Sequence, residues 1–296
     1  MNRLYRWFDF VMLFITLLGL IIVSLLLGLT YTDDWPPSYY YHSYVLPVVF
    51  SFVTFLVSFV VLFYIAYNIY MTKKLVDSER KQFSLNLFFR VYVFFTLALL
   101  SLDIGLIWFI LNDSSKVAVS LFGFNIYFYS ISLAYSMIFG MVAILYFYLF
   151  VENEYYKGVN VNRLIGVAVL YLILTVILVS PYNFYGAVTP SGVFDVRIVS
   201  NLLLMVLYLY VIFKAVKELN KKIRASDNKL AKNKLKLTRS GYLVVLGFFL
   251  FYAIDAIYSG EPYTFFMIVA YVFFIVGVLM VYMGTLTPKW LEGKLV

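Results

Sequence analysis

Long apolar stretches alternate with short polar segments along this chain of 296 residues. Apolar runs of about 20 residues match the ~30 Å hydrocarbon core of a bilayer when they fold as helices. The run at 117–151 is longer, so we expect a single span with a break or a non-spanning start near Gly123 to Asn125, or a helix that projects beyond the bilayer. The pattern predicts eight membrane-spanning helices, at residues 8–30, 45–70, 87–111, 117–151, 163–180, 196–213, 240–258 and 263–284.

Composition indicates the same class of protein. Hydrophobic residues make up 64% of the chain and charged residues 13%, whereas about a quarter of a soluble domain is charged. We therefore predict one integral membrane domain over residues 1–296, an all-α polytopic transmembrane helix bundle. The absence of Cys, together with abundant Tyr, is compatible with an archaeal or thermophilic source.

The positive charge is concentrated in the connector 214–239, which holds ten of the 23 Lys and Arg and two acids. This segment alone accounts for the net charge of +8. If the first flanking segment lies inside, eight spans place 21 of the 23 basic residues on that side. Because basic loops stay in the cytoplasm, we predict that both termini lie inside. We expect the protein to reside in the cytoplasmic membrane of a prokaryote.

The connector also has an internal pattern. Val216, Ile223, Leu230 and Leu237 repeat every seven residues, and Glu218 and Lys222 have the spacing of an i,i+4 pair. Either the preceding helix continues and turns back near 225–228, or the segment lies along anionic headgroups. It serves as a topology anchor or as a docking surface for a protein partner or lipid. The candidate docking residues are Lys221, Lys222, Arg224, Lys229, Lys232, Lys234 and Lys236.

Few catalytic chemistries are available to this chain. With one His (His42) and no Cys, it cannot form a thiolate site, a His-pair metal site or a HExxH motif. Neither a GxxxxGK[ST] phosphate loop nor a GxGxxG fingerprint occurs. We expect no enzymatic activity, no cofactor and no metal. Because the excess charge lies in one segment beside apolar runs, anionic lipid headgroups are a simpler partner than nucleic acid.

Two carboxylates fall within predicted spans. Asp103 lies eight residues before the end of its span, and Asp255 lies three residues from the outer end of another. A carboxylate at such depth must face the bundle interior, a cavity or a partner, and Arg197 is the cation placed to pair with Asp255. These residues form a candidate proton, cation or ligand-amine site. The structural alternative is a protonated or hydrogen-bonded Asp103 and an Asp255 in the headgroup region.

Other patterns indicate packing and ligand contact. Ser132, Ser136 and Gly140 recur every four residues and predict close helix packing, within the bundle or in a homo-oligomer. The polar stretch ENEYYKGVNVN connects two spans. The predicted outer loops are rich in aromatic and acidic residues, which form either an interfacial belt or a mouth for an apolar or cationic ligand. They include Asp33, Asp34, Trp35, Tyr39, Tyr40, Tyr41, Tyr44, Tyr182, Phe184, Tyr185, Asp195, Glu261 and Tyr263.

The last apolar run is followed by Pro288, Lys289, Trp290 and Leu291. This exit resembles the end of the seven-helix sensor region found in some prokaryotic histidine kinases and in stand-alone relatives. The resemblance implies ligand sensing by the second to eighth helices and a cytoplasmic output, and it carries over no site residues.

Three functions remain open. The leading hypothesis is a receptor-like sensor or scaffold that acts through a cytoplasmic partner. The second is a transporter or channel for a small solute or ion that uses Asp103 and Asp255. The third is an accessory subunit of a membrane complex.

Overall fold

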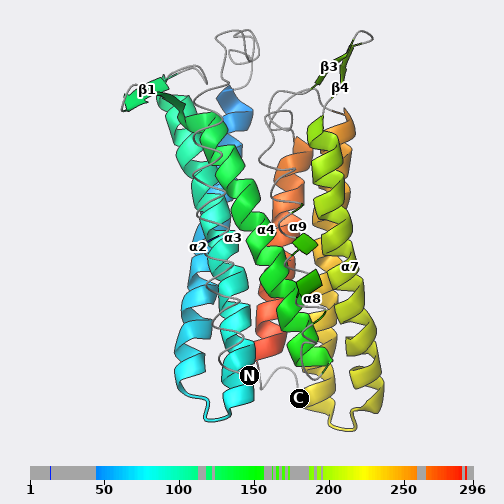
Figure 1. The fold of residues 1–296 in the computed structure, drawn as a ribbon. Helices are drawn as coiled ribbons and strands as arrows, with labels where there is room; N and C mark the ends of the chain where they lie inside the picture. Colours follow the sequence, from blue (N-terminus) through cyan, green and yellow to red (C-terminus); the bar gives the residue numbers. More distant parts are fainter. Residues whose placement is uncertain are drawn as a thin grey trace. The chain divides into compact units, whose positions relative to one another are not determined.

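The computed structural model describes residues 45–112, 118–121, 124–156, 187–189, 192–194, 196–258 and 265–288, with a few isolated positions. Most of these residues lie in six long helices (Figure 1): α2 (Val45–Lys74), α3 (Glu79–Asn112), α4 (Phe128–Tyr155), α7 (Val196–Ala225), α8 (Lys229–Tyr258) and α9 (Phe265–Leu286). In α2, α3, α4, α8 and α9, a stretch is long and apolar enough to cross a membrane. The predicted spans at 8–30 and 163–180 fall largely outside the described residues, so the number eight stays a prediction.

The side chains on the exposed faces of the helices indicate whether these faces contact lipid or water. On α2, Val60, Phe63 and Tyr67 are exposed, whereas Ile65 and Ile69 on another face are buried. Large apolar side chains along an exposed helix face are suited to lipid and unsuited to water. The sequence-based prediction of a helical integral membrane protein is therefore confirmed.

The chain divides into two compact units, which we describe separately. Unit 1 comprises Met1–Leu56, Phe94–Leu145 and Asn160–Leu204. Unit 2 comprises Val57–Val93, Tyr146–Val159 and Met205–Val296.

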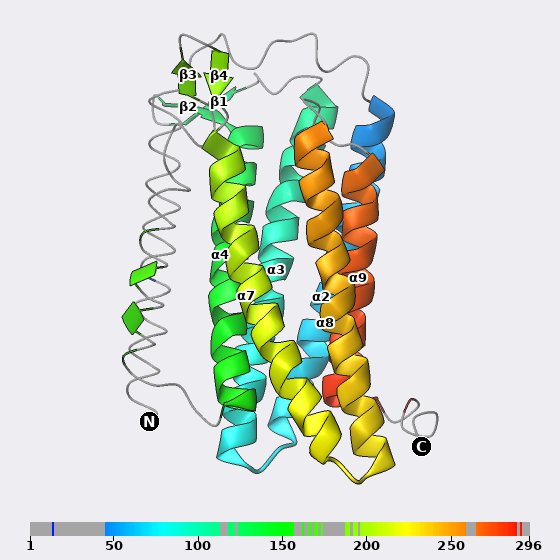
Figure 2. The same cartoon turned by 90° about the vertical axis from the view of Figure 1, so that its right-hand side faces the viewer.

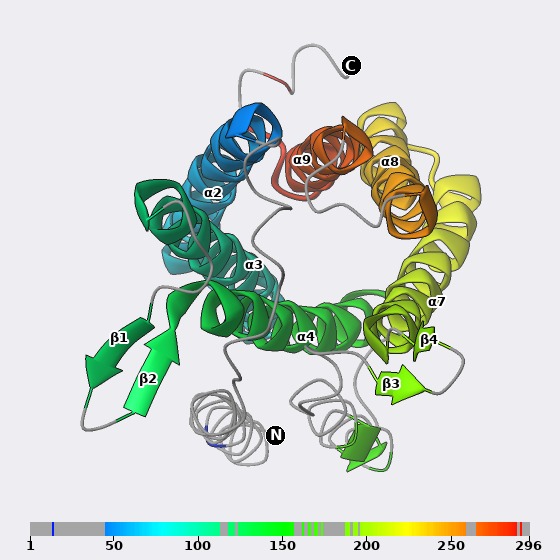
Figure 3. The ribbon, with the colours of Figure 1, turned by 90° about the horizontal axis from the view of Figure 1, so that it is seen from above.

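Unit 1 contains two short β-ladders beside its helical segments, drawn as arrows in Figure 3. Strand β1 (Ala118–Leu121) pairs antiparallel with β2 (Phe124–Tyr127), and β3 (Ala187–Thr189) pairs with β4 (Gly192–Phe194). The long apolar run at 117–151 is thus interrupted by the first ladder, and helix α4 begins only at Phe128. The expected break is confirmed, whereas sequence analysis predicted no strands on either side of it.

Unit 2 contains two helical hairpins, α2–α3 and α7–α8 (Figures 1 and 2). Helix α7 runs unbroken through the first half of the basic connector to Ala225, and α8 starts at Lys229. The Asn228 side-chain oxygen accepts a hydrogen bond from the Ala231 N–H at 3.1 Å, which caps α8. Of the two arrangements that the sequence allowed, the structure has the continuing helix that turns back near 225–228.

The core of unit 2 surrounds the last turns of α4. Residues 146–153 of this helix are all buried, on every face. The Phe150 ring stacks on Phe88 of α3 with centroids 4.6 Å apart, and Phe147 lies 5.5 Å from Tyr242 of α8. A helix end buried on all sides must satisfy its polar groups through neighbouring helices.

Helices α8 and α9 lie side by side and approach closely (Figures 2 and 3). A Cβ added at Gly241 would lie 2.7 Å from the carbonyl oxygen of Gly277, and one at Gly277 would lie 2.9 Å from the carbonyl oxygen of Gly241. The two backbones are therefore in direct contact, which glycine on both helices permits. Helix α9 ends at Leu286, followed by Thr287 in the left-handed conformation and by Pro288.

Candidate functional site

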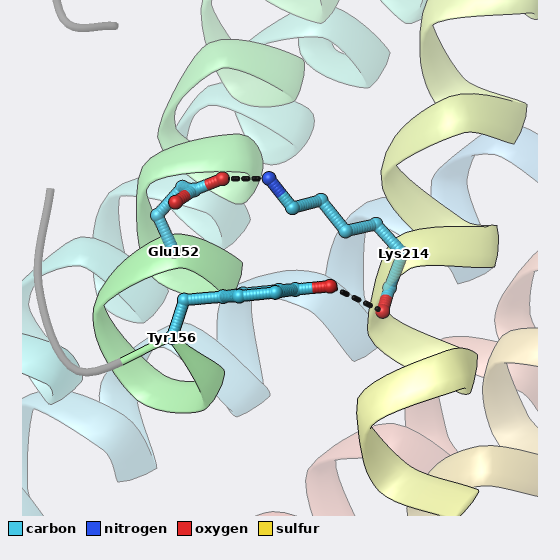
Figure 4. Close-up of polar contacts among 3 residues, drawn as sticks. All are labelled: Glu152, Tyr156 and Lys214. Carbon is cyan, nitrogen blue, oxygen red and sulfur yellow. Dashed lines mark hydrogen bonds and ion pairs between the residues drawn. The ribbon is translucent and has the colours of Figure 1, made fainter. Parts of the chain in front are cut away.

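Charged groups gather at the C-terminal end of α4, in unit 2. Glu152 is fully buried, and its carboxylate forms an ion pair with the Lys214 ammonium of α7 (Figure 4). The Lys214 side chain is 14% exposed, so the pair lies at the edge of the unit with its acid inside. A buried carboxylate needs such a partner, because desolvation would otherwise cost several kcal/mol.

Aromatic rings surround the Lys214 ammonium. Its nitrogen lies 4.5 Å from the ring centroid of Tyr156, 5.2 Å from that of Tyr148 and 5.9 Å from that of Tyr210. The Tyr156 hydroxyl also donates a hydrogen bond to the Lys214 backbone carbonyl at 3.5 Å (Figure 4). Burial lowers the pKa of the Lys214 ammonium, while the Glu218 carboxylate opposes this effect. Charge attraction to Glu152 and to the ring faces holds this cation between α4 and α7.

The neighbouring residues of α4 bind two other helices. The Ser84 hydroxyl of α3 donates to a Glu154 carboxylate oxygen at 2.5 Å, and Arg80 donates to the Asn153 carbonyl at 3.4 Å. Lys222 of α7 donates to the Glu154 carbonyl at 3.1 Å. Cations thus meet the free carbonyls at the negative end of the α4 dipole.

We refer to this set as the polar cluster, and it connects α3, α4 and α7. Its members are Arg80, Ser84, Glu152, Asn153, Glu154, Tyr156, Lys214 and Lys222.

Sequence analysis missed the polar cluster because it treated ENEYYKGVNVN as a simple connection between spans. In the structure, α4 continues through Glu152 to Tyr155 and buries the acid. A signal was present in the sequence. Glu152 and Glu154 directly follow the apolar run at 117–151, on the predicted cytoplasmic side, where most basic residues lie. Acids at such a position are expected to pair with basic side chains.

The second feature of unit 2 is the basic hairpin, which we define as residues 214–239. The described side chains at the predicted docking positions point outward to different extents. Lys221, Arg224, Lys229 and Lys236 are exposed, and Lys222, Lys232 and Lys234 are half-exposed. The hairpin therefore presents cations on both of its helices.

Contacts within the basic hairpin differ in part from the predicted ones. Glu218 accepts from Lys221 at 2.6 Å, whereas Lys222, its predicted i,i+4 partner, donates to Glu154 of α4. Arg239 of α8 donates to the Asn220 side chain of α7 at 3.0 Å. Of the seven-residue repeat, Ile223 is buried. The apolar stripe thus contributes to the interior of unit 2, and the charged faces remain available for docking.

Asp103 of α3, in unit 1, is buried with 3% of its surface exposed. Neither carboxylate oxygen has a hydrogen-bond partner among the described residues. The helices α8 and α7 contain Asp255 and Arg197, respectively, but the side chains of these two residues lie outside the described part of the structure. Of the three residues of the candidate intramembrane site, the structure describes the side chain of Asp103 only. A contact between Asp103 and Asp255 or Arg197 therefore stays a prediction.

The small residues of α4, at positions 132, 136 and 140, do not form a backbone contact like the one between α8 and α9. A Cβ at Gly140 would meet no atom within 4 Å, Ser136 is half-buried, and the Ser132 side chain lies outside the described residues. The outer aromatic and acidic loops fall outside them as well. Among the described residues, no group of three His, Cys, Asp or Glu side chains is arranged to hold a metal ion.

Comparison with protein-family models, with curated proteins and with solved structures gave no match.

Proposed function

We propose that the protein is a receptor-like sensor or scaffold of a prokaryotic cytoplasmic membrane, which acts through an acidic cytoplasmic partner bound at the basic hairpin. The observation that carries this proposal is the unbroken continuation of α7 into the connector and the return of the chain along α8. A helical hairpin presents its charges on a fixed scaffold, whereas a flexible loop does not. Fixed cations lose less conformational entropy when a partner binds.

The proposed orientation places the basic hairpin and both termini in the cytoplasm, with eight spans in all. Support comes from the charge distribution, because this arrangement puts 21 of the 23 basic residues on one side. The final Pro288 to Leu291 segment, which resembles the exit of seven-helix sensor regions, agrees with an inside C-terminus.

The polar cluster gives the proposed sensor a physical connection between bundle and output. Lys214 and Lys222 attach the start of the hairpin to α4, and Arg80 and Ser84 attach α4 to α3. A shift of α4 relative to α7 would have to break or rearrange these charge-assisted contacts. In this proposal, ligand binding to the bundle changes the hairpin through that rearrangement.

Cross-linking in native membranes tests the docking role. We expect an acidic protein to cross-link to hairpin lysines and to be lost when Lys229 and Lys236 are both changed to Gln. The matched control changes Lys74 and Lys81 to Gln, two exposed lysines on the α2–α3 hairpin of unit 2. Equal loss in the two variants, or no cross-linked protein in the wild type, would contradict the proposal.

A transporter or channel is the second candidate, and the buried Asp103 favours it. A carboxylate without hydrogen-bond partners in an apolar helix is costly unless it exchanges a proton or binds a cation. In proteoliposomes, Asp103→Asn should abolish a proton- or cation-coupled flux while insertion is unchanged. Absence of flux for every tested ion and solute in the wild type would count against this candidate.

A further inference from the structure

One face of α7 changes from apolar to cationic along its length. Val206, Tyr210 and Phe213 are exposed by 60%, 54% and 56%, and their spacing of four and three residues places them on one side of the helix. Lys217 and Lys221 continue the same side at intervals of four, and both are exposed. The opposite side of the helix, at Val211, Ala215 and Leu219, is buried.

The change occurs over one turn, between Phe213 and Lys217, which are about 6 Å apart along the helix axis. An apolar side followed by tyrosine and lysine is the arrangement that membrane helices present at the boundary between acyl chains and headgroups. The predicted span also ends at residue 213. A span that ends at this residue would place this part of α7 at the level of the lipid phosphates.

A hollow opens on the surface of unit 2 at this level. It has a volume of about 330 Å³ and is lined by Tyr156, Tyr210, Phe213, Lys214 and Lys217. The volume is at the lower end of the range for small-molecule sites and suits a headgroup better than a whole lipid. Its lining combines cations, phenol groups and an apolar ring.

The charges around the hollow favour an anion. Among the described residues, no ion pair or hydrogen bond involves the Lys217 ammonium, so this cation is available for a ligand. Lys214 shares its charge with Glu152, but that carboxylate is fully buried behind it. Glu218, which also acts on the Lys214 charge, accepts a hydrogen bond from Lys221. Glu154 accepts one from Ser84 of α3. The accessible side of the hollow is thus positive.

We propose that this hollow binds the headgroup phosphate of an anionic phospholipid whose acyl chain lies along Val206, Tyr210 and Phe213. Lys217 contacts the phosphate directly, and Lys214, held in position by Glu152 and the tyrosine rings, supplies a second cation. Basic pockets between membrane helices on the cytoplasmic side commonly bind anionic lipids in this way. The proposal is independent of the sensor or scaffold role. It requires that the protein is embedded in a membrane with Lys217 at the level of the headgroups.

Native mass spectrometry of the full chain tests this site. The protein is purified in a neutral detergent and titrated with phosphatidylglycerol or with phosphatidylcholine of the same acyl chains. We expect phosphatidylglycerol to remain bound at one preferred site and phosphatidylcholine to be lost. Lys217→Gln should weaken phosphatidylglycerol binding about fivefold, the loss typical of one basic residue at an anionic membrane surface.

The control variant is Lys236→Gln, which removes one exposed lysine of α8 that does not line the hollow. It should leave phosphatidylglycerol binding unchanged. Phe213→Ala should also weaken lipid binding, because the acyl chain loses its contact, and glycerol phosphate at millimolar concentration should not displace the lipid.

Three results would overturn the assignment. Equal retention of the two lipids would show that the phosphate site is not selective for anionic lipid. Equal weakening by Lys217→Gln and Lys236→Gln would show general charge attraction. Displacement of the lipid by glycerol phosphate would identify a site for a soluble phosphate.

Discussion

Glu152 and Lys214 form the ion pair on which the polar cluster depends. The acid has no exposed surface, whereas the Lys214 side chain keeps 14%. Loss of either residue therefore changes the free energy of unfolding by a different amount, because an unpaired lysine can reach water and an unpaired Glu152 carboxylate cannot.

Lys214→Met should reduce the free energy of unfolding by about 3–5 kcal/mol, since Glu152 would remain buried without a partner. The double variant Glu152→Leu with Lys214→Met should recover most of this loss, because it buries no charge. Thermal unfolding in detergent measures both effects. Equal destabilisation of the single and double variants would show that the pair is not coupled.

Thr287 ends α9 in a conformation that favours glycine, with φ of 40°. Its N–H donates to the Met283 carbonyl at 2.9 Å, which closes the last turn. A β-branched residue in the left-handed region costs roughly 1–2 kcal/mol, so Thr287→Gly should raise the thermal unfolding temperature. Thr287→Val keeps the branched Cβ and serves as the control, for which no gain is expected.

Helices α8 and α9 are in direct backbone contact at Gly241 and Gly277. Gly277→Ala should destabilise the protein by about 1–3 kcal/mol, because the new methyl group would overlap the α8 backbone at Gly241 and Val245. The matched control is Gly140→Ala, where a Cβ meets no atom within 4 Å and the helix propensity of alanine is a gain. Chemical unfolding of the two variants and the wild type measures both effects. Equal destabilisation by the two substitutions would contradict the proposed overlap at Gly277.

The contrast between these glycines explains part of what the sequence could not predict. The spacing of Ser132, Ser136 and Gly140 concerns one helix only. The contact at Gly241 and Gly277 joins two helices, and spacing within one segment does not tell which helix lies opposite. Similarly, Glu152 could be located near a span end from sequence, but its partner Lys214 lies 62 residues away along the chain.

Two other features of the fold could be predicted from the sequence. The turn at 225–228 follows from Ser-Asp-Asn, residue types that leave helices readily and cap the next one. The break before α4 follows from a run too long for one bilayer crossing. The short strands β1 to β4 were not predicted, because each has only three or four residues and depends on its partner.

In the orientation that we propose, the basic hairpin is a cytoplasmic extension of two membrane helices. The docking role requires this orientation, and the lipid site requires that Lys217 lies at the level of the headgroups. Reversal of the chain in the membrane would place the ten basic residues of the hairpin outside.

Because the chain contains no Cys, single cysteines report orientation without background. Asp227→Cys places a thiol in the exposed turn of the hairpin, and Ser115→Cys places one in a predicted outer loop. In intact cells, a membrane-impermeant maleimide should label residue 115 and not residue 227, and permeabilisation should make residue 227 reactive. Labelling of residue 227 in intact cells, with residue 115 protected until permeabilisation, would contradict the account.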